Sequence, residues 1–317
     1  MKFPRGKLLL ENTQLEFINL ENVLSASKRE RAHRISGYIS IVYHDVVELI
    51  FLKQGEPFNA ARVSQKERKI VSISEVVEKA KKSTIPGFIS EYATDEILLN
   101  LIITSITHKP IKANVSFSTL QPKIFIDKLK TTGFNGFIWV KSGIGESFIH
   151  FHEGNITGCY VAGSAKKLTG DEIISFISKP TLDISIFDRV EDTTITQATP
   201  AQVNMFCTIF SSLLKSYAHP IGDVLVLRTF ISSKSTVQKE FPFIEQFVIE
   251  SDRSITGTMV VEPRLFAQGM ARWFDLIHES FSTFLGKEST VIAKKVLNDY
   301  RFALKSLHFF DYTKLKV

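Results

Sequence analysis

The sequence predicts an α+β protein with two tandem copies of a small antiparallel-sheet-plus-helices domain, followed by a C-terminal module with a helical hairpin. Three observations lead to this fold class. A β-hairpin pattern occurs twice, its flanking segments repeat with a period of roughly 105 residues, and the pattern changes near residue 222 to helix-length apolar segments. The 317 residues include 44% hydrophobic residues and 26 Phe, enough for two or three cores. The expected domains are 1–110, 111–221 and 222–317.

The two predicted hairpins carry glycines at matching positions. Gly37 and Gly55 bracket the first hairpin and Gly136 and Gly154 the second, with a separation of 18 residues in both. Each hairpin has two apolar stretches joined by a polar or Gly-containing bend, and Gln-Gly or Glu-Gly then forms a second tight turn. A third strand is expected after each of these turns.

The segments on either side of the hairpins also repeat. A strand and a short helix precede each hairpin, and a helix, a strand and a closing apolar helix follow it. Ser74 and Thr169 stand where the N-cap residue of the first following helix is expected. The paired segments are 7–24 with 112–129, 74–80 with 169–176, 87–92 with 182–187, and 95–108 with 201–217.

Alternate positions of the second hairpin strand stay apolar in both copies. They are Ile50 and Leu52 in the first copy and Ile149 and Phe151 in the second. Side chains two residues apart on a strand leave the same face of the sheet. We therefore expect these four side chains to be buried.

The first copy resembles the bacterial PATAN-type domain. The resemblance lies in Leu20, Val23 and Leu24 of a leucine-bearing helix, in 37–41 and in 49–61. It covers 1–110 and extends more weakly over 111–220, where Cys159 and Tyr160 replace small residues. It implies a signalling-accessory domain that acts with response regulators or other signalling modules. The family brings no catalytic residues to carry over.

The cysteine content and the hydropathy predict a cytoplasmic protein without a membrane span. Cys159 and Cys207 are the two cysteines of the chain, which is far from the density of a disulfide scaffold. No apolar core of signal-peptide length follows Met1. The longest apolar segments, 97–106 and 203–214, are shorter than a bilayer span.

His150 and His152 are candidate metal ligands because they alternate along one strand and share a face, with Glu153 or Cys159 nearby. The alternative is a partly covered sheet face, and it is favoured because the first copy has Phe51 and Lys53 at these positions. Glycine-rich phosphate loops and nucleophile motifs do not occur at the required spacing. We expect no metal, no cofactor and no enzymatic activity.

Lys28, Arg29, Arg31 and Arg34 form the densest basic stretch, and the second copy lacks the corresponding segment. A solvated helix end explains such a stretch most simply. The functional alternative is docking to an acidic protein surface, a phosphate or an anionic lipid. These four residues are the predicted interaction residues.

The C-terminal module is expected to begin with strands at 224–227 and 247–250 and to end with two amphipathic helices. In the first helix Pro263 suits the first turn and Gly286 the C-terminal cap. The second helix is expected over 289–308. The aromatic stripe of the first helix forms either a self-contained core or an oligomer interface.

The leading functional prediction is a non-enzymatic signalling adaptor that binds a protein partner. It depends on the two PATAN-like copies and the distinct C-terminal module. The alternative is a nucleic-acid or anionic-ligand binding protein, suggested by a net charge of +6, a pI of about 9.1 and the stretch 28–34.

Overall fold

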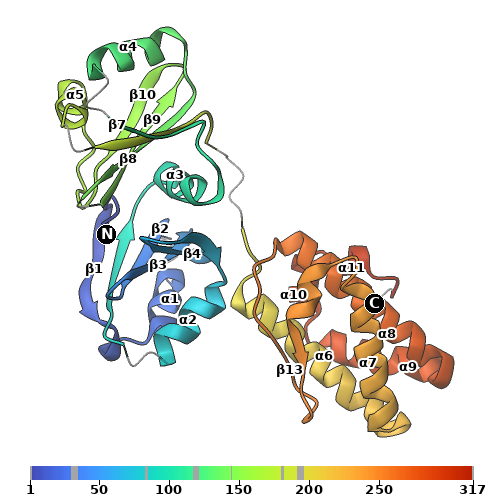
Figure 1. Ribbon diagram of the computed structural model, residues 1–317. Helices are drawn as coiled ribbons and strands as arrows, with labels where there is room; N and C mark the ends of the chain where they lie inside the picture. The colour runs from blue at the N-terminus through green and yellow to red at the C-terminus, as the bar shows by residue number, and fades with distance from the viewer. Residues whose placement is uncertain are drawn as a thin grey trace. The chain divides into compact units, whose positions relative to one another are not determined.

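The computed structural model describes residues 2–29, 35–82, 85–116, 121–143, 145–179, 182–190 and 196–315. The chain divides into two compact units (Figure 1). Unit 1 comprises Met1–Val71 and Val76–Thr194, and unit 2 comprises Ser72–Glu75 and Ile195–Val317. The protein is a mixed α/β protein in which two antiparallel sheets are followed by a helical region.

Both sheets lie in unit 1. The first carries β1 (Lys7–Gln14), β2 (Gly37–Val42), β3 (Val46–Lys53), β4 (Glu56–Ser64), β5 (Arg68–Val71) and β6 (Phe88–Ala93). The second carries β7 (Lys112–Ser116), β8 (Gly136–Ser142), β9 (Gly145–His152), β10 (Asn155–Tyr160) and β11 (Asp183–Phe187). The helices are η1 (Leu15–Phe17), α1 (Leu20–Arg29), α2 (Ile73–Lys82), α3 (Glu96–Thr107), α4 (Pro122–Thr131) and α5 (Asp171–Ile177).

The two sheets order their strands alike. The first has the order β1-β6-β2-β3-β4-β5 and the second has β7-β11-β8-β9-β10 when read from β7. If β5 is left out, both sheets place their strands in the chain order first, fifth, second, third, fourth. The third strands predicted after Gly55 and Gly154 are β4 and β10.

The marker glycines occupy matching backbone environments. A Cβ on Gly37 would lie 2.0 Å from the carbonyl oxygen of Tyr92, and a Cβ on Gly136 would lie 2.1 Å from that of Phe187. Only glycine permits such a close approach of a neighbouring strand. The second turns also agree, with positive φ values at Gln54 (51°), Gly55 (79°), Glu153 (48°) and Gly154 (76°).

Helix α3 lies between the two sheets (Figure 1). One hydrophobic core combines Tyr38 and Phe51 of the first sheet, Ile102 of α3, and Phe137 and Phe148 of the second sheet. The N-terminal segment adds a backbone connection, because Glu146 N donates to Lys2 O and Gly163 N donates to Phe3 O, both at 2.9 Å. The two sheets therefore belong to one packed unit.

The predicted burial of the alternate strand positions is confirmed. Ile50, Leu52 and Ile149 are 0% exposed and Phe151 is 1% exposed. The opposite faces of the same strands are buried as well, with Phe51 in the core between the sheets. A central strand that is covered on both faces has a nearly continuous run of apolar residues in its sequence.

Unit 2 is mainly helical. It contains α6 (Pro200–Ile221), α7 (Asp223–Val237), η3 (Pro242–Gln246), α8 (Pro263–Leu285), α9 (Lys287–Asn298), α10 (Arg301–Ser306) and α11 (Phe309–Tyr312), with a two-stranded sheet of β12 (Phe247–Ile249) and β13 (Ile255–Gly257). Pro263 in the first turn of α8 and Gly286 as its C-cap are confirmed. The predicted strand near 247 is confirmed as β12.

The predicted strand at 224–227 is wrong, because these residues begin α7. The buried positions Val226, Phe230, Ser233 and Val237 recur every three or four residues, which is the period of a helix. The long apolar segment at 201–217 belongs to α6, whose buried side chains pack in the core of unit 2 instead of closing the second copy.

Three predicted helix boundaries also differ. Helix α2 begins at Ile73, one residue before the expected cap Ser74, and Gly170 instead of Thr169 is the N-cap of α5. The last predicted helix ends at Asn298 as α9, and α10 follows separately. Over the described residues, no helix combines the length and the apolar character that a bilayer crossing requires.

Candidate functional site

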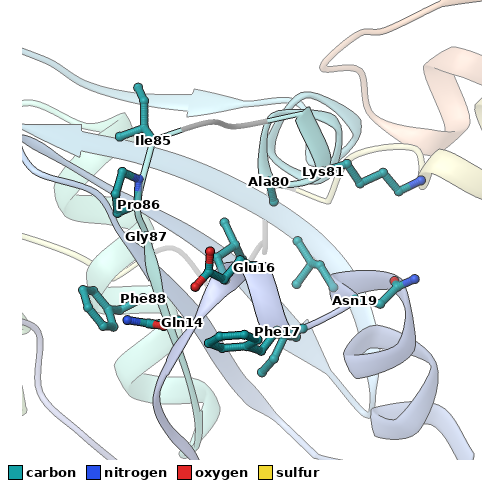
Figure 2. A pocket seen from close by; sticks show the side chains of 13 residues that line it. Gln14, Glu16, Phe17, Asn19, Ala80, Lys81, Ile85, Pro86, Gly87 and Phe88 are labelled. Carbon is teal, nitrogen blue, oxygen red and sulfur yellow. The ribbon is translucent and has the colours of Figure 1, made fainter.

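A groove of about 710 Å³ opens at one end of the first sheet. Figure 2 shows its labelled residues, which come from the end of β1 and the turn after it, the end of α2, and the segment that leads into the first residue of β6. The two sides of the groove are far apart in the sequence. The lining residues are Gln14, Leu15, Glu16, Phe17, Ile18, Asn19, Leu20, Ala80, Lys81, Ile85, Pro86, Gly87 and Phe88.

Local hydrogen bonds fix one wall of the groove. Leu15 N donates to Gly87 O at 2.8 Å, which ties η1 to the segment before β6. Asn19 Oδ1 accepts from Glu21 N at 2.9 Å and caps the start of α1. A Cβ on Gly87 would lie 3.0 Å from the Tyr43 ring, so a larger residue here would crowd this buried aromatic.

The groove combines a buried floor with exposed apolar side chains. Leu15 and Leu20 are 7% and 2% exposed, whereas Phe17, Ile85 and Phe88 are 74%, 56% and 37% exposed. Apolar side chains that gather at a concave surface are typical of interaction sites. The groove therefore offers apolar contacts to a ligand that lies along it.

A charged pair lies beside these apolar residues. Lys81 Nζ is 2.7 Å from Glu21 Oε1, and the hydrogen bond that Lys81 donates to this carboxylate raises the pKa of Lys81. Both side chains are about half exposed, at 41% and 54%. Such a surface pair contributes little to stability but gives the groove polar groups that can orient a partner.

The predicted interaction residues divide between α1 and an undescribed segment. Lys28 and Arg29 lie in the last turn of α1, the helix that starts at the groove, and their side chains are outside the described part of the chain. Arg31 and Arg34 lie outside the described residues. Sequence reasoning did not identify the groove residues. The available signal was an aromatic residue, Phe17, between two polar residues, Glu16 and Asn19, in the short segment that links a strand to a helix.

The two candidate metal ligands do not form a metal site with Cys159. His150 Nδ1 contacts Thr157 Oγ1 at 2.5 Å, and His152 is exposed. Cys159 packs in the core on the α4 and α5 side of the sheet, where burial raises the pKa of its thiol to about 12. Within the described ranges, no group of three or more His, Cys, Asp or Glu residues is placed to hold a metal ion.

A buried charge cluster lies behind the groove. Glu48 on β3 is 0% exposed, and its Oε1 accepts from Arg62 Nε at 2.8 Å and from Lys79 Nζ at 2.9 Å. The Lys79 ammonium also lies 4.3 Å from the centre of the Tyr43 ring. Burial, reinforced by the Glu48 carboxylate, raises the pKa of Tyr43 to about 12. These contacts attach α2 to the sheet.

No family model, curated protein or solved structure matches the chain.

Proposed function

We propose that the protein is a non-enzymatic, cytoplasmic adaptor of a bacterial signalling system, and that the groove binds an apolar segment of its protein partner. The single observation that carries this proposal is the exposure of Phe17, Ile85 and Phe88 around one hollow. Aromatic and large aliphatic side chains that become buried on association dominate the binding energy of protein interfaces.

The two sheets represent diverged copies of one PATAN-like domain in this proposal. Their shared strand order and the matching positive φ values at their second turns support a duplication. The close approach of a neighbouring strand at Gly37 and Gly136 supports it as well. The second copy and α3 then serve as the scaffold that holds the groove-bearing first copy.

The groove is tested with the double variant Phe17→Ser/Ile85→Ser in capture from the native cell. We expect it to lose the partner that the unaltered chain recovers, because each substitution removes apolar surface from the interface. Stability should change by less than about 1 kcal/mol in total, since both side chains are exposed in the free protein.

The matched control is Phe302→Ser/Ile124→Ser. It removes the same residue types from positions that are 90% and 62% exposed and outside the groove. This control should recover the partner as well as the unaltered chain does. Equal recovery by the groove variant and the control would refute the proposed site.

A further prediction concerns the basic stretch. Replacing Lys28, Arg29, Arg31 and Arg34 together with Gln should leave the melting temperature nearly unchanged, since surface charges contribute less than about 0.5 kcal/mol each. The same change should weaken partner binding, most at low ionic strength where screening is least. Undiminished partner binding at low salt would remove these residues from the interaction surface.

The salt dependence of binding separates the alternative function from the adaptor function. If the chain binds nucleic acid through the basic stretch, affinity should fall steeply with salt as counterions are released. Partner binding through the groove, assisted by the basic stretch, predicts a shallower dependence on salt than nucleic-acid binding does, and titration of the purified partner at several salt concentrations measures it.

A further inference from the structure

A second hollow, of about 430 Å³, lies on the first sheet over β2 and β6. Its floor consists of three directly opposed cross-strand pairs. These pairs are Tyr38 with Tyr92, Ser40 with Ser90, and Val42 with Phe88. Residues two apart on a strand share a face, so the pairs form one ladder that runs from aromatic rings through hydroxyls to apolar side chains.

An irregularity in β1 forms one wall of this hollow. The register between β1 and β6 shifts between Leu10 and Thr13, and Asn12 has a positive φ of 35°. The two intervening residues, Glu11 and Asn12, line the hollow, and Asn12 N donates to Ser90 Oγ at 3.0 Å. The bulge thus places polar groups beside the hydroxyl pair.

The N-terminal segment forms the other wall and brings two cations. The Tyr38 hydroxyl donates to Pro4 O at 2.6 Å and Arg5 N donates to Ser164 O at 2.9 Å, which fixes the path of this segment. Lys2 and Arg5 both line the hollow. The Arg5 guanidinium lies 5.7 Å from the centre of the Tyr92 ring, and within the described residues no carboxylate forms an ion pair with it.

In the second sheet, a tryptophan side chain occupies the position equivalent to Ser40. If Gly136 is aligned with Gly37, Trp139 takes the position of Ser40 and pairs across the strands with Ser185. Its ring lies 4.2 Å from the Arg68 guanidinium and 4.0 Å from the Lys141 ammonium, and its Nε1 donates to Glu146 Oε2 at 3.1 Å. Arg68 also pairs with Glu146. The second sheet thus has an aromatic side chain at this place, and the cation beside it, Arg68 of β5, has a counterion in Glu146, whereas the first sheet has two serines and Arg5.

We propose that the hollow over Ser40 and Ser90 binds the phosphate group of a small molecule. Arg5 offers a planar set of donors that matches a phosphate, Lys2 adds a second positive charge, and the Ser40 and Tyr92 hydroxyls lie on the floor. Ser40 and Tyr92 are 8% and 7% exposed, so the anion would meet a largely desolvated surface. Glu11 is the opposing charge.

Calorimetric titration of the full chain with inorganic phosphate and with pyrophosphate, at constant ionic strength set with chloride, tests the proposal. We expect saturable binding. Arg5→Gln should weaken binding at least about tenfold, as expected for loss of a charged hydrogen-bond partner. Arg5→Lys should fall between Arg5→Gln and the unaltered chain. Glu11→Gln should bind more tightly, since it removes a repelling carboxylate.

The matched control is Lys82→Gln, whose side chain is 78% exposed and outside the hollow, and it should bind phosphate like the unaltered chain. Thermal unfolding of each variant is measured in parallel. If Arg5→Gln does not fold, the affinity of Glu11→Gln tests the proposal in its place: tighter phosphate binding than in the unaltered chain supports the site, and unchanged affinity overturns it. Absence of saturable binding to both probes would overturn the proposal. Equal affinities of the unaltered chain, Arg5→Gln and Glu11→Gln would overturn it as well.

Discussion

A fragment that begins at residue 222 should fail to fold, whereas residues 196–317 should unfold in a single cooperative transition. The difference between the two fragments is α6 together with the four residues before it. The helix places Phe206, Phe210 and Tyr217 at 0% exposure in the core of unit 2. The fragment that starts at 222 lacks all of these side chains.

The contacts of α6 show why the expected effect is large. Phe210 lies 4.6 Å from Trp273 and Tyr217 lies 4.3 Å from Phe281, measured between ring centres. The Tyr217 hydroxyl also donates to Ser289 O at 3.2 Å. Truncating one buried aromatic residue costs about 3–5 kcal/mol, and a domain has about 5–15 kcal/mol in total, so losing several exceeds what unit 2 can tolerate.

Thermal unfolding followed by near-ultraviolet circular dichroism distinguishes the two fragments. Residues 196–317 should show a fixed aromatic signal and a sharp transition, and residues 222–317 should show neither. Monomeric, cooperative folding of the shorter fragment would contradict the assignment of α6 to this core. Self-association of the longer fragment would favour an oligomer interface on its helices.

A large single-residue effect is expected for Glu48→Ala, which should lower the free energy of unfolding by about 3–5 kcal/mol. Glu48 is 0% exposed, while Arg62 and Lys79 are 19% and 33% exposed at their side chains. Removing the carboxylate takes away the buried acceptor that Arg62 and Lys79 share and leaves the two partly buried cations close together. Chemical denaturation of the full chain measures the change.

An exposed ion pair provides the control for this variant. Glu67 pairs with Lys69 at 2.8 Å, and the two side chains are 51% and 46% exposed. Glu67→Ala should change stability by less than about 1 kcal/mol, because water solvates both charges. If Glu48→Ala were no more harmful than Glu67→Ala, the cluster would not be what holds α2 to the sheet.

The sequence allowed most strands and helices to be predicted because their signals are local. Gly37, Gly55, Gly136 and Gly154 mark turns and close approaches that few other residues permit, and the structure places them accordingly. Pro263 and Gly286 bound α8 for the same kind of reason. Where the backbone conformation or its surroundings permit only glycine or proline, that residue and its sequence neighbours are enough to predict a turn or a helix end.

The sequence-based predictions were wrong or incomplete where tertiary packing determines the secondary structure or the shared core. Val224 to Leu227 are β-branched or aliphatic and resemble a strand, yet Val226 and Phe230 are buried at helical spacing in α7. The edge strand β5 was missed because its four residues include Arg68 and Lys69. The shared core around α3 was also missed, since nothing local shows that an apolar helix packs against two sheets at once.

The groove was inaccessible to sequence reasoning for a related reason. Its walls come from residues 14–20, 80–81 and 85–88, which the fold brings together, in part through the pairing of β1 with β6. Phe17 is an exposed apolar residue in a short turn, and single exposed apolar residues are common on protein surfaces. Its significance appears only when Ile85 and Phe88 are seen across the same hollow.

Photocrosslinking from within the groove tests most directly whether this surface binds a protein partner. A photoreactive phenylalanine analogue replaces Phe17 in the full chain, and a second chain carries it at Phe302 as the control, since both positions are exposed. Irradiation in the native cell should join position 17 to one discrete protein through an apolar segment, and position 302 should not capture that protein. Absence of a discrete product from position 17, or the same product from both positions, would contradict the proposed interaction site.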